Sequence, residues 1–137
     1  TLPDVDQSIL DLFEAGYATE VETSAEIKRV YEASDYIEDP HTAVASAVYQ
    51  KYAERTGDKT PTVIASTASP YKFPRVAVEA VSGQAPADDF VAVKELEKLS
   101  GVAIPKAVNG LETAEVRHKT VVATGDMQKA VENYLGL

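Results

Sequence analysis

The residues with the clearest chemical potential lie between Thr62 and Phe73, where the sequence reads TVIASTASPYKF. Three hydroxyl side chains, Ser66, Thr67 and Ser69, follow a short apolar run and precede a proline. If the apolar run is a strand, its hydroxyls lie at the carboxyl end, where open α/β sheets place their ligands. Nothing nearby in the sequence offers a base to activate a nucleophile. The hydroxyls therefore fit either the capping of a turn or donation to a bound ligand.

A second informative segment reads DPHTAV at residues 39–44. Asp39 followed by Pro40 is typical of a helix start, because the carboxylate accepts from backbone N–H groups and proline suits the first helical position. The N–H groups of His41 or Thr42 are the expected donors, and capping occupies donors that a phosphate would otherwise find there. We therefore expect His41 to pack and hydrogen-bond, not to act as a base.

The composition excludes several kinds of site. The chain has 137 residues, of which 45% are hydrophobic, with no cysteine and two histidines, His41 and His118. That length suits one domain with a modest core. Without cysteine there is no disulfide, thiolate zinc site or cysteine nucleophile. With only two histidines, a histidine-rich metal site is not expected either.

The net charge of −9 is concentrated at the front of the chain. Residues 1–39 hold eleven acidic and two basic side chains, and the remaining residues are balanced. Nucleic acid and anionic membranes would be repelled, so neither is an expected partner. No apolar run approaches the ~20 residues of a membrane helix, and no secretory signal pattern is present. The acidic front fits a solvated surface, with a cation-binding or partner-docking surface as the alternative.

The elements that must position these residues are mostly helical, with one or two short strands, Thr62–Ala65 and the weaker Lys119–Ala123. The predicted fold class is therefore α/β. A lone short strand cannot satisfy its own backbone hydrogen bonds, so its neighbours are expected in sequence upstream of Thr1. Cap signals and apolar spacing predict six helices: from Asp6 to Gly16, from a Thr23–Glu26 capping box onward, from Pro40 to Gly57, from Pro74 to Gly83, from Asp88 or Asp89 to Gly101, and over Met127–Leu135.

Taken together, the two segments resemble the C-terminal region of threonine synthases, which are lyases dependent on pyridoxal 5'-phosphate (PLP). In that family a Ser-Thr-Ala segment followed by Pro-x-Lys-Phe lies against the cofactor, and its threonine hydrogen-bonds the pyridine nitrogen. The resemblance therefore implies that Thr67 contacts the cofactor and that Ser66 assists. A neutral hydroxyl at that nitrogen tunes the ring differently from a carboxylate. Ser69 replaces a histidine of some relatives and receives no role.

The resemblance places no catalytic residue and no metal ligand in this chain. Lys72 matches a family lysine that does not form the Schiff base, so we expect a structural or surface contact. The family's Phe-Lys-Asp lysine, its glycine- and asparagine-rich phosphate segment and its Ser-Ile-Asn-type segment are absent. Arg117 and His118 match an Arg-His pair that precedes the last helix in this family. Together with Lys119 they form a run of three basic residues. This run is expected to face water, to meet an acidic element of the same protein, or to bind an anion.

The resemblance implies a fold-type-II PLP enzyme, similar to the tryptophan synthase β subunit, with residues 1–137 as a single domain at the C-terminal end of a larger chain. The whole enzyme would convert O-phospho-L-homoserine and water into L-threonine and phosphate in the cytoplasm. This chain alone would be inactive, and its partner would be the missing N-terminal part. The alternative is a small acidic interaction or regulatory module without catalysis, and another fold-type-II enzyme is a third possibility. An upstream Phe-Lys-Asp lysine would favour the enzyme.

Overall fold

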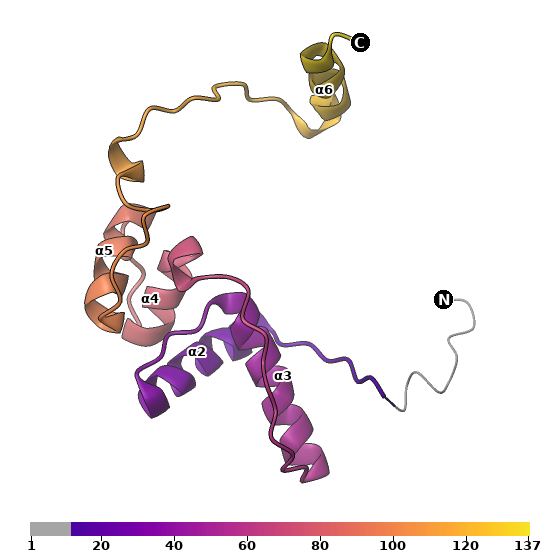
Figure 1. Ribbon diagram of the computed structural model, residues 1–137, viewed down its shortest axis with the longest axis vertical. Helices are drawn as coiled ribbons and strands as arrows, with labels where there is room; N and C mark the ends of the chain where they lie inside the picture. The colour runs from indigo at the N-terminus through magenta and orange to yellow at the C-terminus, as the bar shows by residue number, and fades with distance from the viewer. Residues whose placement is uncertain (1–11) are drawn as a thin grey trace.

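A computed structural model describes residues 12–137 (Figure 1). Within these residues the secondary structure is entirely helical, so the predicted α/β class with one or two strands is wrong. The α-helices are α2 (Glu20–Ser34), α3 (Pro40–Thr56), α4 (Pro74–Ser82), α5 (Asp89–Ser100) and α6 (Met127–Leu135), and the 3-10 turns are η1 (Pro70–Lys72), η2 (Leu111–Thr113) and η3 (Thr124–Asp126).

The segment Thr62–Ala65, predicted as the clearest strand, has no strand partner among the described residues. Its Val63 side chain is 95% exposed, and the weaker candidate Lys119–Ala123 is likewise unpaired and exposed. β-Branched residues favour an extended backbone, but a strand exists only where a neighbour accepts and donates its hydrogen bonds. No described segment supplies that neighbour.

The predicted first helix, Asp6 to Gly16, falls mostly outside the described residues. The described residues from Phe13 to Ala18 are not helical, and Gly16 does not adopt the left-handed conformation expected of a helix stop. Gly16 instead lies against α3, where an added Cβ would come within 2.6 Å of the Val48 Cγ1 atom. Because Gly16 has no side chain, this segment can pack closely against α3.

Helix α2 begins one turn earlier than the sequence pattern indicated. Its capping box uses Thr19 and Glu22: the Thr19 N–H donates to Glu22 Oε2 at 2.7 Å, and the Glu22 N–H donates to Thr19 Oγ1 at 3.3 Å. The predicted Thr23–Glu26 box is wrong, because Thr23 lies in the first turn and donates to the Thr19 carbonyl at 2.8 Å. Two consecutive patterns of the same kind occur here, and the earlier one begins the helix.

The remaining helix boundaries agree with the predictions. Asp39 caps α3 and Asp88 caps α5, each accepting from two backbone N–H groups. Gly57, Gly83 and Gly101 end α3, α4 and α5 with φ angles of 70°, 74° and 65°, a left-handed region that glycine enters without strain.

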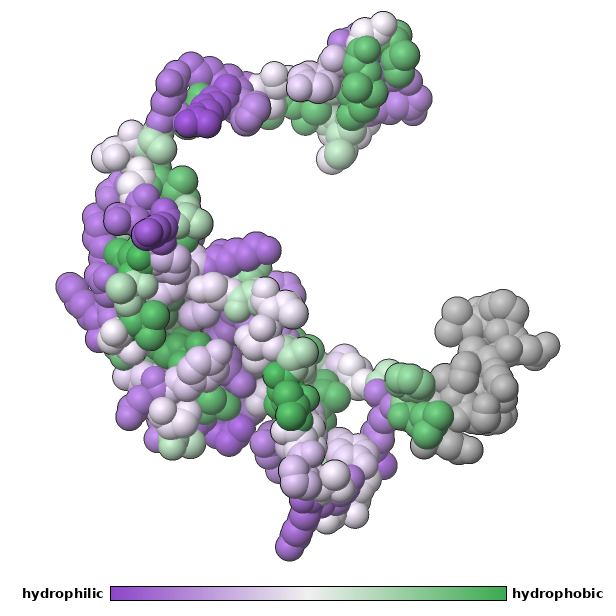
Figure 2. All heavy atoms as spheres, viewed as in Figure 1, coloured by the Kyte–Doolittle hydropathy of each residue, from purple (hydrophilic) through white to green (hydrophobic). Residues whose placement is uncertain are grey.

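The core lies where α2 packs against α3 and α4, and where α4 packs against α5 (Figure 1). Ile27, Val78 and Leu96, one from each of three helices, are fully buried. Helix α6 stands apart beyond an extended segment, and among the described residues its main contacts are with η3 (Figure 1). Its predicted apolar stripe exists but faces solvent, as the patch on α6 in Figure 2 shows.

Part of the acidic N-terminal segment, residues 1–39, forms ion pairs within the chain. Glu22 forms an ion pair with Lys51 of α3 at 2.6 Å, and Glu14 pairs with Arg55 of the same helix. These contacts tie the front of the chain to α3. Among the described residues, no helix is long and apolar enough to cross a membrane.

Candidate functional site

The predicted cofactor residues Ser66 and Thr67 lie on the segment that joins α3 to η1. After α3 ends, the chain doubles back along that helix (Figure 1), with the Tyr52 hydroxyl donating to Asp58 at 2.9 Å near the turn. The segment has no helix or turn over residues 59–67, and both Ser66 and Thr67 are exposed. Exposure leaves the Thr67 hydroxyl open to a partner.

A chain of side-chain hydrogen bonds connects this segment to the start of α3. The Thr42 hydroxyl is bonded to the Asp39 Oδ2 atom, and it lies 2.9 Å from the Ser66 hydroxyl oxygen. Asp39 also accepts from the backbone N–H groups of His41 at 2.9 Å and Thr42 at 3.3 Å. The two segments that the sequence singled out separately are therefore in contact.

The charge of Asp39 sets the direction of these bonds. Burial alone raises the pKa of Asp39, which is 1% exposed, but hydrogen bonds from Thr42 and from the His41 N–H outweigh burial and hold the pKa below its ordinary value. The ionised carboxylate can only accept, so the single hydroxyl proton of Thr42 points to Asp39. Ser66 must then donate its own proton to Thr42. The Ser66 oxygen keeps lone pairs that can accept, and the next donor along the segment is Thr67.

Two further carboxylates are buried beside this network. Glu26 accepts two hydrogen bonds from Arg29, at 2.8 and 2.7 Å, and one from Ser46 at 2.5 Å. The bonds from Arg29 lower the pKa of Glu26 although burial opposes them. Burial first, and then the nearby charge of Glu26, raise the pKa of Glu38, whose Oε2 atom has no partner among the described residues.

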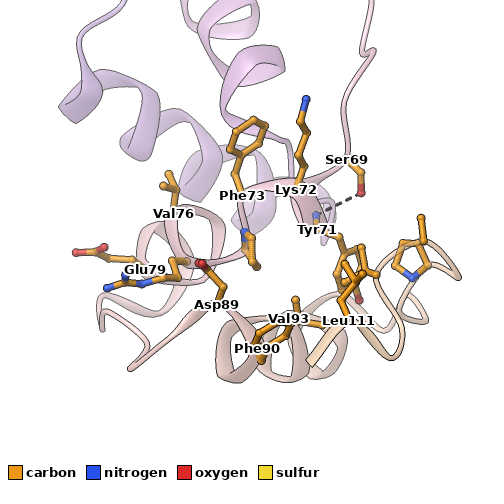
Figure 3. A pocket seen from close by; sticks show the side chains of 15 residues that line it. Ser69, Tyr71, Lys72, Phe73, Val76, Glu79, Asp89, Phe90, Val93 and Leu111 are labelled. Carbon is orange, nitrogen blue, oxygen red and sulfur yellow. Dashed lines mark hydrogen bonds between the residues drawn. The ribbon is translucent and has the colours of Figure 1, made fainter. Parts of the chain in front are cut away.

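The Pro-Tyr-Lys-Phe segment is anchored by its tyrosine. Tyr71 is 5% exposed, and its hydroxyl donates to the Val102 carbonyl after α5. The Ser69 hydroxyl accepts from the Tyr71 N–H at 3.3 Å, the dashed line in Figure 3, so Ser69 caps η1. Lys72 is exposed, with its Nζ atom 5.5 Å from the centre of the Phe73 ring. These contacts match the structural or surface role expected of Lys72.

Two hollows among the described residues do not include the predicted cofactor residues. One, of about 860 Å³, lies between η1, α4, α5 and residues 105–111, with Phe90, Val93 and Leu111 on one side (Figure 3). The other, of about 850 Å³, lies between α2, α3 and α4 and includes the exposed His41. Ser66 and Thr67 line neither, so in this chain they face an open surface.

The other basic candidates lie far along the chain. Arg117, His118 and Lys119 are exposed on the extended segment before α6. Among the described residues, no group of three or more histidine, cysteine or carboxylate side chains is placed to hold a metal ion.

A family match covers the segment from Thr42 through α6. The family described as "Threonine synthase, C-terminal" matches residues 42–134. The chain belongs to this family. The match begins at Thr42 and includes both Ser66 and Thr67.

Individual relatives agree with the family match. Threonine synthase of Saccharomyces cerevisiae is 35% identical over 123 residues, which cover 82% of this chain and 24% of the yeast protein. Threonine synthase-like 1 of Homo sapiens is 44% identical over 70 residues, covering 50% of this chain and 9% of that protein. The same protein of Mus musculus is 42% identical over 69 residues, again 50% of this chain and 9% of the relative. The chain thus spans about a quarter of the yeast threonine synthase.

Two residues of this threonine synthase segment were not selected from the sequence. Thr42 was considered only as a backbone donor in the first turn of α3, yet its side chain bridges Asp39 and Ser66. Tyr71 was treated as the variable position of the Pro-x-Lys-Phe pattern, yet it is the buried anchor. A weak signal existed for Thr42, because a buried hydroxyl must find a partner.

Proposed function

We propose that this chain supplies part of the PLP site of a threonine synthase, with Thr67 donating its hydroxyl proton to the pyridine nitrogen of the cofactor. The whole protein would convert O-phospho-L-homoserine and water into L-threonine and phosphate. Residues 1–137 would form a single domain at the C-terminal end of that longer polypeptide. The observation that carries the proposal is the family match over residues 42–134, together with the exposed Thr67 hydroxyl within it.

The local chemistry fits a pyridine nitrogen. Among the described residues the Thr67 hydroxyl makes no hydrogen bond, so its proton is available, while the neighbouring Ser66 proton is directed to Thr42. A neutral hydroxyl donates to an unprotonated nitrogen without supplying a charge that would hold the ring protonated. When bound, PLP acts as an electron sink for carbanions. This chain's own contribution would be to orient the ring and set the protonation of its nitrogen.

The rest of the site would come from the remainder of the longer polypeptide. Ser66 and Thr67 face an open surface here, so a cofactor pressed against them needs an opposite wall from residues outside this chain. The lysine that binds the cofactor and the segment that binds its phosphate belong to that remainder in this proposal. We therefore expect the 137-residue chain alone to form no threonine.

Replacing Thr67 tests the cofactor contact. In the longer polypeptide, Thr67→Val keeps the shape of the side chain but removes the donor, whereas Thr67→Ser keeps the donor. An unsatisfied buried partner costs about 1–3 kcal/mol, so PLP retained after dialysis should fall roughly tenfold or more in Thr67→Val, with slower threonine formation. Thr67→Ser should lie close to the parent protein.

Ser69→Ala is the matched control, because Ser69 caps η1 and has no role in the proposal. It should retain PLP as the parent does. If Thr67→Val retains PLP and turns over like the parent, Thr67 does not contact the cofactor.

A small acidic module without catalysis is the alternative function. The 35% identity to yeast threonine synthase over 82% of this chain favours the enzyme, as does the pairing of part of the acidic front with α3. Expression of the longer polypeptide separates the two functions: threonine formed from O-phospho-L-homoserine supports the enzyme, whereas a protein that neither binds PLP nor forms threonine supports the module.

A further inference from the structure

We infer that Thr42 is the residue that positions the segment carrying Ser66 and Thr67, through its hydroxyl contact with Ser66. The consequence for PLP rests on the proposed function, whereas the placement of the segment does not. Thr42 itself would touch neither substrate nor cofactor, because it is buried and reaches the segment only through Ser66.

The fixed end of this arrangement is the first turn of α3. Asp39 is 1% exposed, caps the helix through two backbone N–H groups, and accepts from the Thr42 hydroxyl. Pro40 at the first helical position limits the backbone further. Thr42 is 6% exposed, so its hydroxyl has little freedom to turn to water. The Thr42 oxygen that accepts from Ser66 is therefore held in place.

The segment that carries Ser66 and Thr67 has few other contacts that hold it in place. Among the described residues, the Thr42–Ser66 contact is the hydrogen bond that joins residues 61–68 to the helices, while Thr62 bonds only to the nearby Thr60 carbonyl. Val63 is 95% exposed, so burial contributes little to holding this part of the segment. Ile64 is partly buried, and the Thr42–Ser66 contact is the hydrogen bond that holds this part of the segment to α3.

The contact also decides where Thr67 faces. Successive side chains of an extended run point to opposite sides, and residues 59–67 contain no turn or helix. With Ser66 directed toward α3 through its contact with Thr42, Thr67 is directed away from that helix. Loss of the Ser66 contact would let the segment rotate and would move the Thr67 hydroxyl from its place.

Three variants of the longer polypeptide, purified with PLP, test this inference. Thr42→Val removes the hydroxyl, Thr42→Ser keeps it, and Ser66→Ala removes only the far end of the contact. The last variant leaves the Asp39–Thr42 bond intact, so it remains informative if Thr42→Val disturbs the start of α3. Ser69→Ala serves as the control on the same loop.

The first measurement is the backbone NMR order parameter of residues 62–68 and, for comparison, of residues 43–55 of α3. We expect the order parameters over 62–68 to fall toward about 0.6 in Thr42→Val and Ser66→Ala, from the value of about 0.85 that a held backbone shows. Thr42→Ser and Ser69→Ala should match the parent, and Ser66→Ala should leave α3 unchanged. Parent-like order parameters over 62–68 in both Thr42→Val and Ser66→Ala overturn the inference.

The second measurement is PLP dissociation from the same proteins, with Thr67→Val alongside. Faster dissociation in Thr42→Val and Ser66→Ala, restored in Thr42→Ser, supports the positioning role. If only Thr67→Val loses PLP faster, the proposed function survives and the positioning role is overturned. If PLP dissociates equally from all variants including Thr67→Val, the proposed cofactor contact fails, and the order parameters alone test how the segment is placed.

Discussion

At the scale of single residues, the buried carboxylates next to the candidate site differ in how well they are satisfied. Glu26 is held by Arg29 and Ser46, whereas Glu38 is 6% exposed and has an oxygen without a partner among the described residues. Burial and the charge of Glu26 raise the pKa of Glu38, so its ionised form opposes the fold. A buried charge that is poorly paired is a source of instability.

Neutralising Glu38 should therefore stabilise the chain at neutral pH. In the native state Glu38 holds its proton above the ordinary pKa of 4.5, so its contribution to stability is complete below that value and is lost as pH rises through the raised native pKa. Glu38→Gln should raise the free energy of unfolding by about 1 kcal/mol at pH 7, with the difference shrinking toward pH 4. Urea unfolding across this pH range measures it.

The exposed Glu32→Gln on α2 is the control, since it should change the free energy of unfolding little at either pH. A Glu38→Gln variant that is less stable than the parent at pH 7 would show that the charge at this position is satisfied after all.

Residue types could be selected from the sequence at this scale, but their contacts could not. The hydroxyls of Ser66 and Thr67 and the cap of Asp39 follow from local chemistry and from the family pattern. The contact between Thr42 and Ser66 joins positions 24 residues apart. It depends on how the chain turns after Gly57, which residue patterns alone do not determine.

At the scale of elements, helix ends follow rules that act within a few residues, and most were predicted. The exception is α2, where two consecutive cap patterns occur and Thr19 is the cap that begins the helix. The prediction of a strand at Thr62–Ala65 is wrong for the opposite reason, because a strand depends on a neighbour that local sequence does not determine. Its β-branched residues indicate an extended backbone, which is present, but they cannot supply a neighbour.

The placement of the α2 cap is testable. Thr19→Ala removes the side-chain acceptor for the Glu22 N–H, so it should lower the free energy of unfolding by about 1 kcal/mol. Thermal unfolding followed by circular dichroism measures the loss. Thr120→Ala, on the exposed segment before α6, should leave stability unchanged. Equal stability of Thr19→Ala and the parent would argue against this cap.

At the scale of the whole molecule, the core unites α2 to α5 but not α6. Among the described residues, helix α6 packs mainly against η3, and its apolar side chains Met127, Val131, Tyr134 and Leu135 are all more than half exposed. Other large apolar side chains, such as Leu12 at 82% and Phe13 at 69%, are also exposed near the front. Faces of this size are usually covered by protein, and the chain spans 24% of the yeast relative.

Removing residues 124–137 should consequently leave the α2–α5 core intact in the 137-residue chain. Because α6 does not pack on the described helices of that core, the free energy of unfolding should change by less than about 0.5 kcal/mol. Urea unfolding followed by circular dichroism compares the two chains. A loss of more than about 1 kcal/mol would mean that α6 packs on the core in solution.

The most direct test of the account is the nitrogen resonance of PLP labelled with ¹⁵N in its pyridine ring. In the longer polypeptide, a hydrogen bond from Thr67 should give a chemical shift that moves to the value of an unbonded neutral nitrogen in Thr67→Val and stays in place in Thr67→Ser. The same shift in all three proteins would contradict the assignment of Thr67 to the cofactor.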